Sequence, residues 1–140
     1  MANKLTICGD LSASGNIYGT IPGDNHVNTN CGTANTWSGV DAFANVAAGA
    51  GYNTGYGYHV LCALTTGVCN TGFGALSLNG LTTGQWNTAI GMRALMCNST
   101  GCSNDAHGAY TLMKNTTGGY NVATGEQALY NNTTASYNTA

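Results

Sequence analysis

The stretch "NTAIG", residues 87–91, decides the fold because related versions of it return along the chain at a fixed interval. Each unit is seventeen residues long, opens on an asparagine, and carries glycine at its fifth position and leucine at its ninth. Five complete units keep these three residues: Asn53, Asn70, Asn87, Asn104, Asn121, Gly57, Gly74, Gly91, Gly108, Gly125, Leu61, Leu78, Leu95, Leu112 and Leu129. A fixed period of this kind indicates a stack of like structural units.

Other positions of the unit are restricted as well. The third is small, the thirteenth and fourteenth are hydroxylic, and the fifteenth is glycine in four of the five units. An earlier unit from Asn35 fits if it contains one extra residue, and the chain stops three residues into a further unit. We therefore expect two regions: a β-rich lead-in or connector at 1–34, and a repeat region at 35–140 that is truncated within a repeat.

The unit is too short for the helical repeats of about 33 residues or more and for a propeller blade, which leaves a coil. Side chains alternate along a strand, so positions one, three and five would turn toward one side. The leucine at nine would form the opposite wall, and the residues at twelve to fifteen suit a turn. The sequence therefore predicts an all-β protein, a β-solenoid with two short strands and two turns in each coil. Unrelated turn-rich loops in a β-sandwich are the alternative.

Stacked coils would place like side chains in ladders. Ladders of Asn and Thr satisfy their own polar groups, which suits a chain with only 6% charged residues. Large apolar residues recur at the fourth position, as in Tyr56, Phe73 and Ile90, and at the seventeenth, as in Trp86 and Tyr120. Because a coil of this size has a thin interior, such residues on exposed edges predict self-association.

The units resemble repeats of bacteriophage tail-fibre and other receptor-facing fibre proteins and, more distantly, the head repeats of trimeric autotransporter adhesins. The resemblance covers about residues 35–140. The segment "LTICGDLSASGNIYGTIPGD", residues 5–24, looks like stretches that precede the shafts of phage fibres. The resemblance implies an elongated homotrimeric fibre, part of a virion or extracellular, whose shaft presents a receptor-binding tip.

Four of the six cysteines form two pairs that each bracket a turn of their own unit: Cys62 with Cys69, and Cys97 with Cys102. A turn that folds back on itself would bring each pair to the separation that a disulfide requires, and a disulfide would favour an oxidising location. Each cysteine is equally well explained as a small buried hydrophobe. The spacings differ from the C-x2-C spacing of zinc sites, so no metal site is expected.

No catalytic or cofactor-binding residue is expected, because His59 and His107 occupy different positions of the unit and the five carboxylates fall in unrelated positions. The net charge of -2 argues against nucleic acid as a partner, and no apolar run is long enough for membrane insertion. Two functions stay open. One is a structural fibre shaft, and the other is a surface adhesin or glycan-binding module that uses the repeat face to bind a host cell-surface glycan or receptor.

Overall fold

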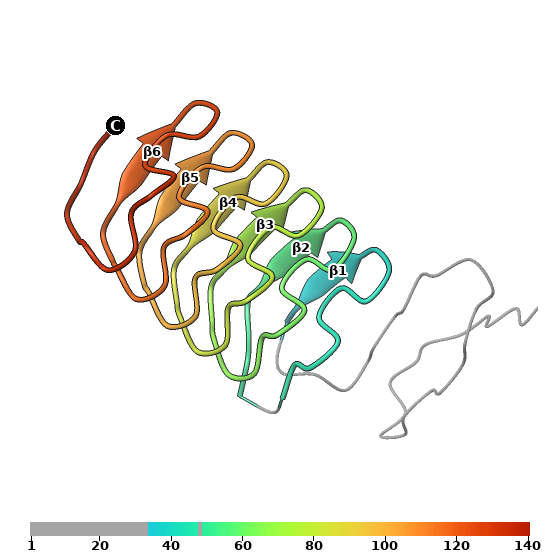
Figure 1. The fold of residues 1–140 in the computed structure, drawn as a ribbon. Coiled ribbons are helices and arrows are strands. Elements are labelled where there is room, and N and C mark those ends of the chain that lie inside the picture. Colours follow the sequence, from blue (N-terminus) through green and yellow to red (C-terminus); the bar gives the residue numbers. More distant parts are fainter. Residues whose placement is uncertain (1–33, 48) are drawn as a thin grey trace, which may run out of the picture.

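The computed structural model describes residues 34–47 and 49–140, so the expected lead-in lies outside the described residues except for Ala34. The described residues form a β-solenoid in which the chain winds once per repeat around a narrow interior (Figure 1). This confirms the predicted all-β solenoid. Each coil holds one short strand: β1 (Thr36–Ser38), β2 (Thr54–Tyr56), β3 (Thr71–Phe73), β4 (Thr88–Ile90), β5 (Asp105–His107) and β6 (Val122–Thr124).

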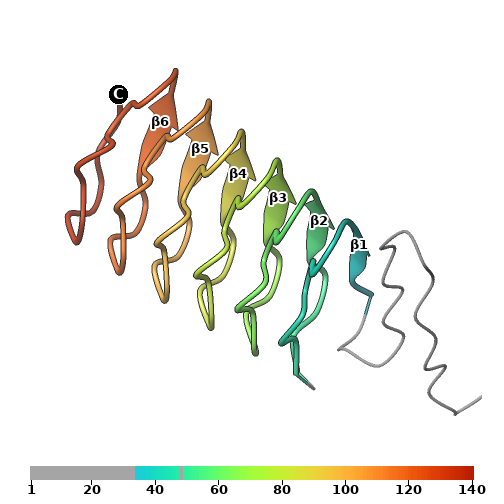
Figure 2. The ribbon, with the colours of Figure 1, turned by 45° about the vertical axis from the view of Figure 1, so that its right-hand side comes forward.

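The strands of the described residues pair in parallel and in chain order, which makes one sheet along one side of the rod (Figure 2). The register follows the repeat, since Thr54 pairs with Thr71 and Gly72 pairs with Ala89. Residues at the same position of successive coils therefore stack in columns. Each column is named below by its position, counted from the first asparagine of the repeat.

The expectation of two strands per coil is wrong. Columns seven and nine have left-handed backbone angles, with φ of 58° at Arg93 and 51° at Leu95. Such residues interrupt an extended strand, so this side of the coil is a series of turns. The turns still bond to neighbouring coils, as the backbone N–H of Leu95 donates to the carbonyl of Thr111 at 3.0 Å.

The extra residue of the first coil lies between Ala47 and Ala50. Before this point the coils match at an offset of eighteen, because the N–H of Ala47 donates to the carbonyl of Thr65, which is its counterpart in column thirteen. After it the offset is seventeen, since Gly51 bridges to Val68. The exposed corner of the coil therefore takes up the insertion, and the strand register is kept.

Leucines of column nine form the apolar side of the interior, as the sequence predicts. Four of them are fully buried, Leu61, Leu78, Leu95 and Leu112, and Leu129 is partly buried. Phe43 takes this position in the first coil and stacks on Trp37, with ring centroids 5.0 Å apart. Full burial of one leucine stabilises a fold by about 1.5–3 kcal/mol, so the column contributes to every coil.

The column-one asparagines of the five complete units are buried on the other side of the interior, and each bonds to both neighbouring coils. The Nδ2 of Asn87 donates to the Oδ1 of Asn70 at 3.0 Å and to the carbonyl of Gly101 at 2.9 Å. Its Oδ1 accepts from the backbone N–H and the Nδ2 of Asn104, at 3.1 and 3.0 Å. The predicted asparagine ladder is confirmed, and it explains why buried amides are tolerated in so thin a core.

A second, shorter asparagine ladder occupies column twelve. The Nδ2 of Asn115 donates to the Oδ1 of Asn98 at 3.2 Å, and the Nδ2 of Asn132 donates to the Oδ1 of Asn115 at 2.9 Å. Buried Leu64 and Leu81 fill the same column in the two preceding coils. In the neighbouring column thirteen, hydroxyls donate to carbonyls of the next coil at 3.0 to 3.1 Å, which is the predicted hydroxyl ladder.

Glycine is required in column five for two reasons. The five glycines have φ between 117° and 144°, a range that side chains disfavour. A Cβ at Gly91 would also collide with the carbonyl oxygen of Gly108 in the next coil. Together these two features explain why the fifth position is glycine in every complete unit.

Candidate interaction surface

Exposed large apolar side chains of the described residues all belong to columns seventeen, two, four and six. These columns are alternate residues of one segment, which runs from column seventeen through the strand to column six and is here called the sheet arc. Its buried counterparts are columns one and three, so the alternation expected along a strand extends beyond the strand itself. The exposed members are Tyr52, Tyr56, Tyr58, Phe73, Trp86, Ile90, Met92, Tyr120, Val122 and Tyr137.

Column four is apolar in three successive coils. Tyr56 and Phe73 are each 41% exposed, and their rings stack with centroids 5.2 Å apart and planes at 15°. Ile90 continues the column, which then becomes polar at His107 and Thr124. The prediction that this column is exposed is confirmed for the large residues.

Column seventeen carries the most exposed aromatic rings of the described residues. Tyr52, Trp86, Tyr120 and Tyr137 are 56–79% exposed. The rings of Tyr120 and Tyr137, which lie one coil apart, stack with centroids 5.0 Å apart and planes at 3°. The sequence also predicts this column, because its large residues recur at the repeat period.

Column six completes the sheet arc and is missing from the sequence-based prediction. Tyr58 and Met92 are exposed there. The column follows column four by two residues, so continuing the period-two alternation past the glycine of column five would have found it.

Away from the sheet arc, on the side here called the opposite wall, column fourteen is exposed. Its members in four successive coils are threonines: Thr66, Thr83, Thr100 and Thr117. The exposed hydroxyls of column fourteen therefore differ in chemistry from the exposed apolar groups of the sheet arc.

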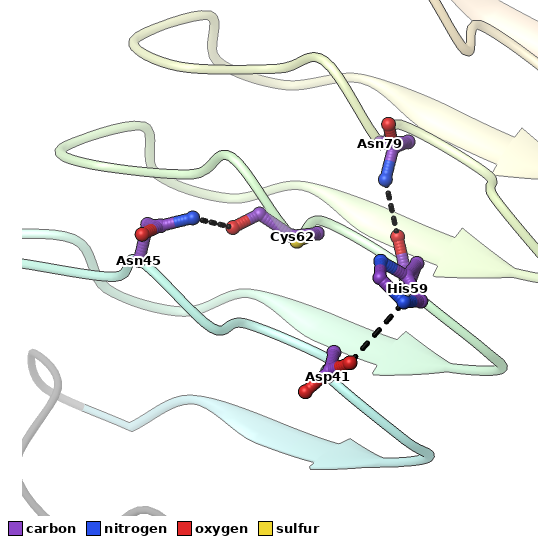
Figure 3. Close-up of polar contacts among 5 residues, drawn as sticks. All are labelled: Asp41, Asn45, His59, Cys62 and Asn79. Atoms are coloured by element: carbon purple, nitrogen blue, oxygen red, sulfur yellow. Dashed lines mark hydrogen bonds and ion pairs between the residues drawn. The ribbon is translucent and has the colours of Figure 1, made fainter.

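Two histidine–aspartate contacts are present among the described residues. The Nε2 of His59 lies 3.2 Å from an Oδ2 of Asp41, and the Nε2 of His107 lies 3.1 Å from an Oδ1 of Asp105. The first contact joins two successive members of column seven (Figure 3). The described carboxylates fall in different columns, as expected, but the sequence analysis does not anticipate that Asp41 shares column seven with His59. The extra residue of its coil follows Ala47, so Asp41 keeps the column-seven position, and the sequence alone does not locate that residue.

Cys62 lies near this contact but is a poor candidate for a nucleophile. Burial raises the pKa of its thiol, and the nearby carboxylate of Asp41 raises it further, so the protonated thiol is favoured. The backbone around it is held by side-chain amides, since Asn45 donates to the Cys62 carbonyl at 2.8 Å and Asn79 to the His59 carbonyl at 3.0 Å (Figure 3). The arrangement positions turns of adjacent coils against each other.

The four cysteines of the expected disulfides are free thiols in the structure: Cys62, Cys69, Cys97 and Cys102. They occupy columns ten, seventeen, eleven and sixteen, and the pairing stays a prediction for thiol labelling. Cys8 and Cys31 lie outside the described residues.

In the part of the chain that the structure describes, no group of three or more His, Cys, Asp or Glu side chains could hold a metal ion. That part also contains no helix with the length and apolar character needed to cross a membrane. Comparison of the chain with known protein families, with curated proteins and with solved structures finds no match. The sheet arc is therefore the candidate site on physical grounds alone.

Proposed function

We propose that the chain is a structural segment of an elongated fibre, which self-associates along its length through the sheet arc. One observation carries the proposal: the exposed large apolar side chains of the described residues all lie on this arc. Concentration of apolar groups on one side of a molecule is typical of a protein contact surface. Covering the arc would add a second apolar core to a rod whose own interior is thin.

The finer proposal rests on the resemblance of the repeats to those of phage tail fibres. It is the shaft of a tail fibre or of a similar extracellular appendage, homotrimeric, located on a virion or outside the cell, and presenting a receptor-binding tip. The column geometry supports a shaft, because each coil bonds its neighbours through the same groups and transmits its orientation along the rod.

Native mass spectrometry with small-angle scattering on the 140-residue chain tests the proposal. We expect a rod that contains more than one copy, and three copies if the trimer is correct. Replacing two rings of column four, as Tyr56→Asn with Phe73→Asn, should weaken assembly by about tenfold or more, since buried aromatic side chains dominate contact energies. The matched control is Thr66→Asn with Thr83→Asn on the opposite wall. A chain that stays monomeric at every concentration would refute the proposal.

A second candidate function is binding of a cell-surface glycan. The observation that favours it is the exposed stacked pair of Tyr56 and Phe73, whose nearly parallel rings could stack on sugar rings. A glycan array probed with the intact chain tests it. Binding that is lost in Tyr56→Asn but kept in Thr66→Asn would support this function, and an array without signal would contradict it.

A further inference from the structure

Column seventeen alternates large and small residues over four successive coils. Tyr52 and Trp86 carry large exposed rings, and the small residues Cys69 and Ser103 alternate with them. Farther along the same column the consecutive rings of Tyr120 and Tyr137 stack with centroids 5.0 Å apart. One coil step therefore equals the stacking distance of two aromatic rings.

Each small residue in this column leaves a slot that is one ring wide. Two steps of the 5.0 Å spacing seen between Tyr120 and Tyr137 would place the rings of Tyr52 and Trp86 about 10 Å apart, with Cys69 between them in the column. A ring inserted midway would lie about 5 Å from both, within the separation of 4.5–7 Å that aromatic pairs favour. A second slot lies between Trp86 and Tyr120, with Ser103 at its base.

We propose that these slots receive column-seventeen rings from a second, antiparallel copy of this chain. The proposal rests on the self-association proposed above and specifies its contact, and it replaces the homotrimer of the finer proposal with a two-fold pair. The column is self-complementary because it holds rings and slots in alternate coils. In the pair, the partner's Trp86 enters the slot at Cys69 and the partner's Tyr52 covers Ser103. The two-fold axis makes both contacts reciprocal, and it closes the assembly at two copies.

The antiparallel arrangement follows from how the column repeats. In a parallel pair held in register, each ring would meet its own counterpart and every slot would face another slot. Three parallel copies around an axis would have the same fault, because three members cannot alternate. A two-fold axis perpendicular to the rod avoids this fault. The same axis places column four of one copy against column four of the other. The apolar members of that column, Tyr56, Phe73 and Ile90, lie in the coils that would overlap.

Charge and area are compatible with such a pair. The described members of column seventeen include no charged residue, so two copies would not repel each other there. A stable contact covers about 800 Å² on each partner. The chain has 7574 Å² of accessible surface, so a contact of that size needs only about a tenth of it.

Filling the slots is the sharpest test. The 140-residue chain is compared with the double variant Cys69→Trp with Ser103→Trp by sedimentation equilibrium. Trp86 stands in the same column with φ of 55°, close to the 58° of Cys69 and Ser103, so the backbone already accepts tryptophan there. We expect a dimer for the native chain and at least tenfold weaker pairing for the variant. Thr66→Trp with Thr100→Trp on the opposite wall is the matched control and should pair as the native chain does.

The outcomes separate this proposal from the one on which it rests. A native trimer, or a dimer that survives slot filling, would overturn the antiparallel contact and leave the self-associating shaft standing. A native monomer would overturn both. Loss of pairing is attributed to the slots only if circular dichroism shows that the filled variant melts as the native chain does. A monomer whose Trp86 fluorescence responds to cellohexaose would assign the slots to sugar rings instead.

Discussion

A buried asparagine does more for this fold than an apolar residue of the same size could. Asn87 bonds the coil before it through Nδ2 and the coil after it through Oδ1, and it also holds the carbonyl of Gly101 in its own coil. The donor and the acceptor act in opposite directions along the rod. The column therefore needs an amide, and neither a carboxylate nor a hydrocarbon replaces it.

Asn87→Asp tests the need for the amide. The substitution keeps an acceptor for Asn104 but removes the donor and buries a charge beside the Oδ1 of Asn70. We expect a loss of about 2 kcal/mol or more at pH 7. Burial raises the pKa of the new carboxyl in the folded state. The stability of the variant should therefore recover as the pH falls and this carboxyl becomes protonated.

Thermal melts of the Asn87→Asp variant and the native chain at pH 7 and at pH 4 measure this difference. Thr100→Asp on the exposed wall is the control and should change the melting temperature little. An Asn87→Asp variant that melts like the native chain at pH 7 would contradict the directional ladder.

Gly91→Val should damage the fold more than a change of propensity does. The φ of 136° and the approach of the Gly108 carbonyl leave no room for a side chain. The expected cost is well above the ~1 kcal/mol that separates glycine from ordinary residues. Met92→Val, at the exposed neighbour, is the control and should be tolerated. Equal urea midpoints for the two variants would refute the assignment of column five.

Counting free thiols tests whether the two cysteine pairs form disulfides. If Cys62 pairs with Cys69 and Cys97 with Cys102, labelling of the unreduced, denatured chain should find at most two free thiols, whereas the free thiols of the structure require at least four. In the folded chain, Cys69 should react before Cys62, because Cys69 is exposed and burial raises the pKa of Cys62. Mass spectrometry after timed alkylation measures both quantities. Faster labelling of Cys62 would contradict the structure.

At the scale of one coil, the columns that the sequence predicts best are those with few residue types. Glycine in column five is explained by a backbone approach that leaves no room for a side chain, and the large apolar residue of column nine by burial in the interior, where Phe43 replaces leucine in the first coil. Column seven is different, because His59, Leu76 and Arg93 share a left-handed backbone without sharing chemistry. The left-handed conformation of column seven does not restrict which residue types occur there. The sequence therefore predicts a second strand where the structure has turns. The exposed columns four and seventeen were predictable because large residues recur there.

The left-handed turn at column seven makes its own prediction. Gln127 is exposed with φ of 60°, so a glycine there loses little packing and relieves a disfavoured conformation. Gln127→Gly should leave stability unchanged or raise it by up to about 1 kcal/mol. Gln127→Val should lower it, because β-branched residues fit this conformation poorly. Chemical denaturation compares the two, with Glu126→Gly as a control that should destabilise; the opposite order would refute the turn assignment.

The whole molecule behaves as a one-dimensional stack. Neighbouring coils of the described residues bond to each other, and the apolar column nine, with Phe43 in the first coil, runs through them. In such arrays stability is approximately the sum of unit terms and nearest-neighbour terms. A change in one coil should therefore be felt by its neighbours and fade beyond them. The same rule would let an interface on the sheet arc stabilise the coils that it covers.

Paired leucine substitutions measure how far this coupling reaches. Leu95→Ala alone should cost about 2–5 kcal/mol, because it opens a cavity in a thin core. Leu78 and Leu95 are successive members of column nine, so their double substitution should depart from the sum of the single effects by about 0.5 kcal/mol or more. Leu61 and Leu112 lie three coils apart, and their double substitution should be additive within that margin. Urea unfolding of the four single and two double variants gives the free energies needed for both double-mutant cycles. Equal coupling in the two pairs would mean that strain spreads through the entire rod, and an unchanged melt for Leu95→Ala would mean that the column does not form the core.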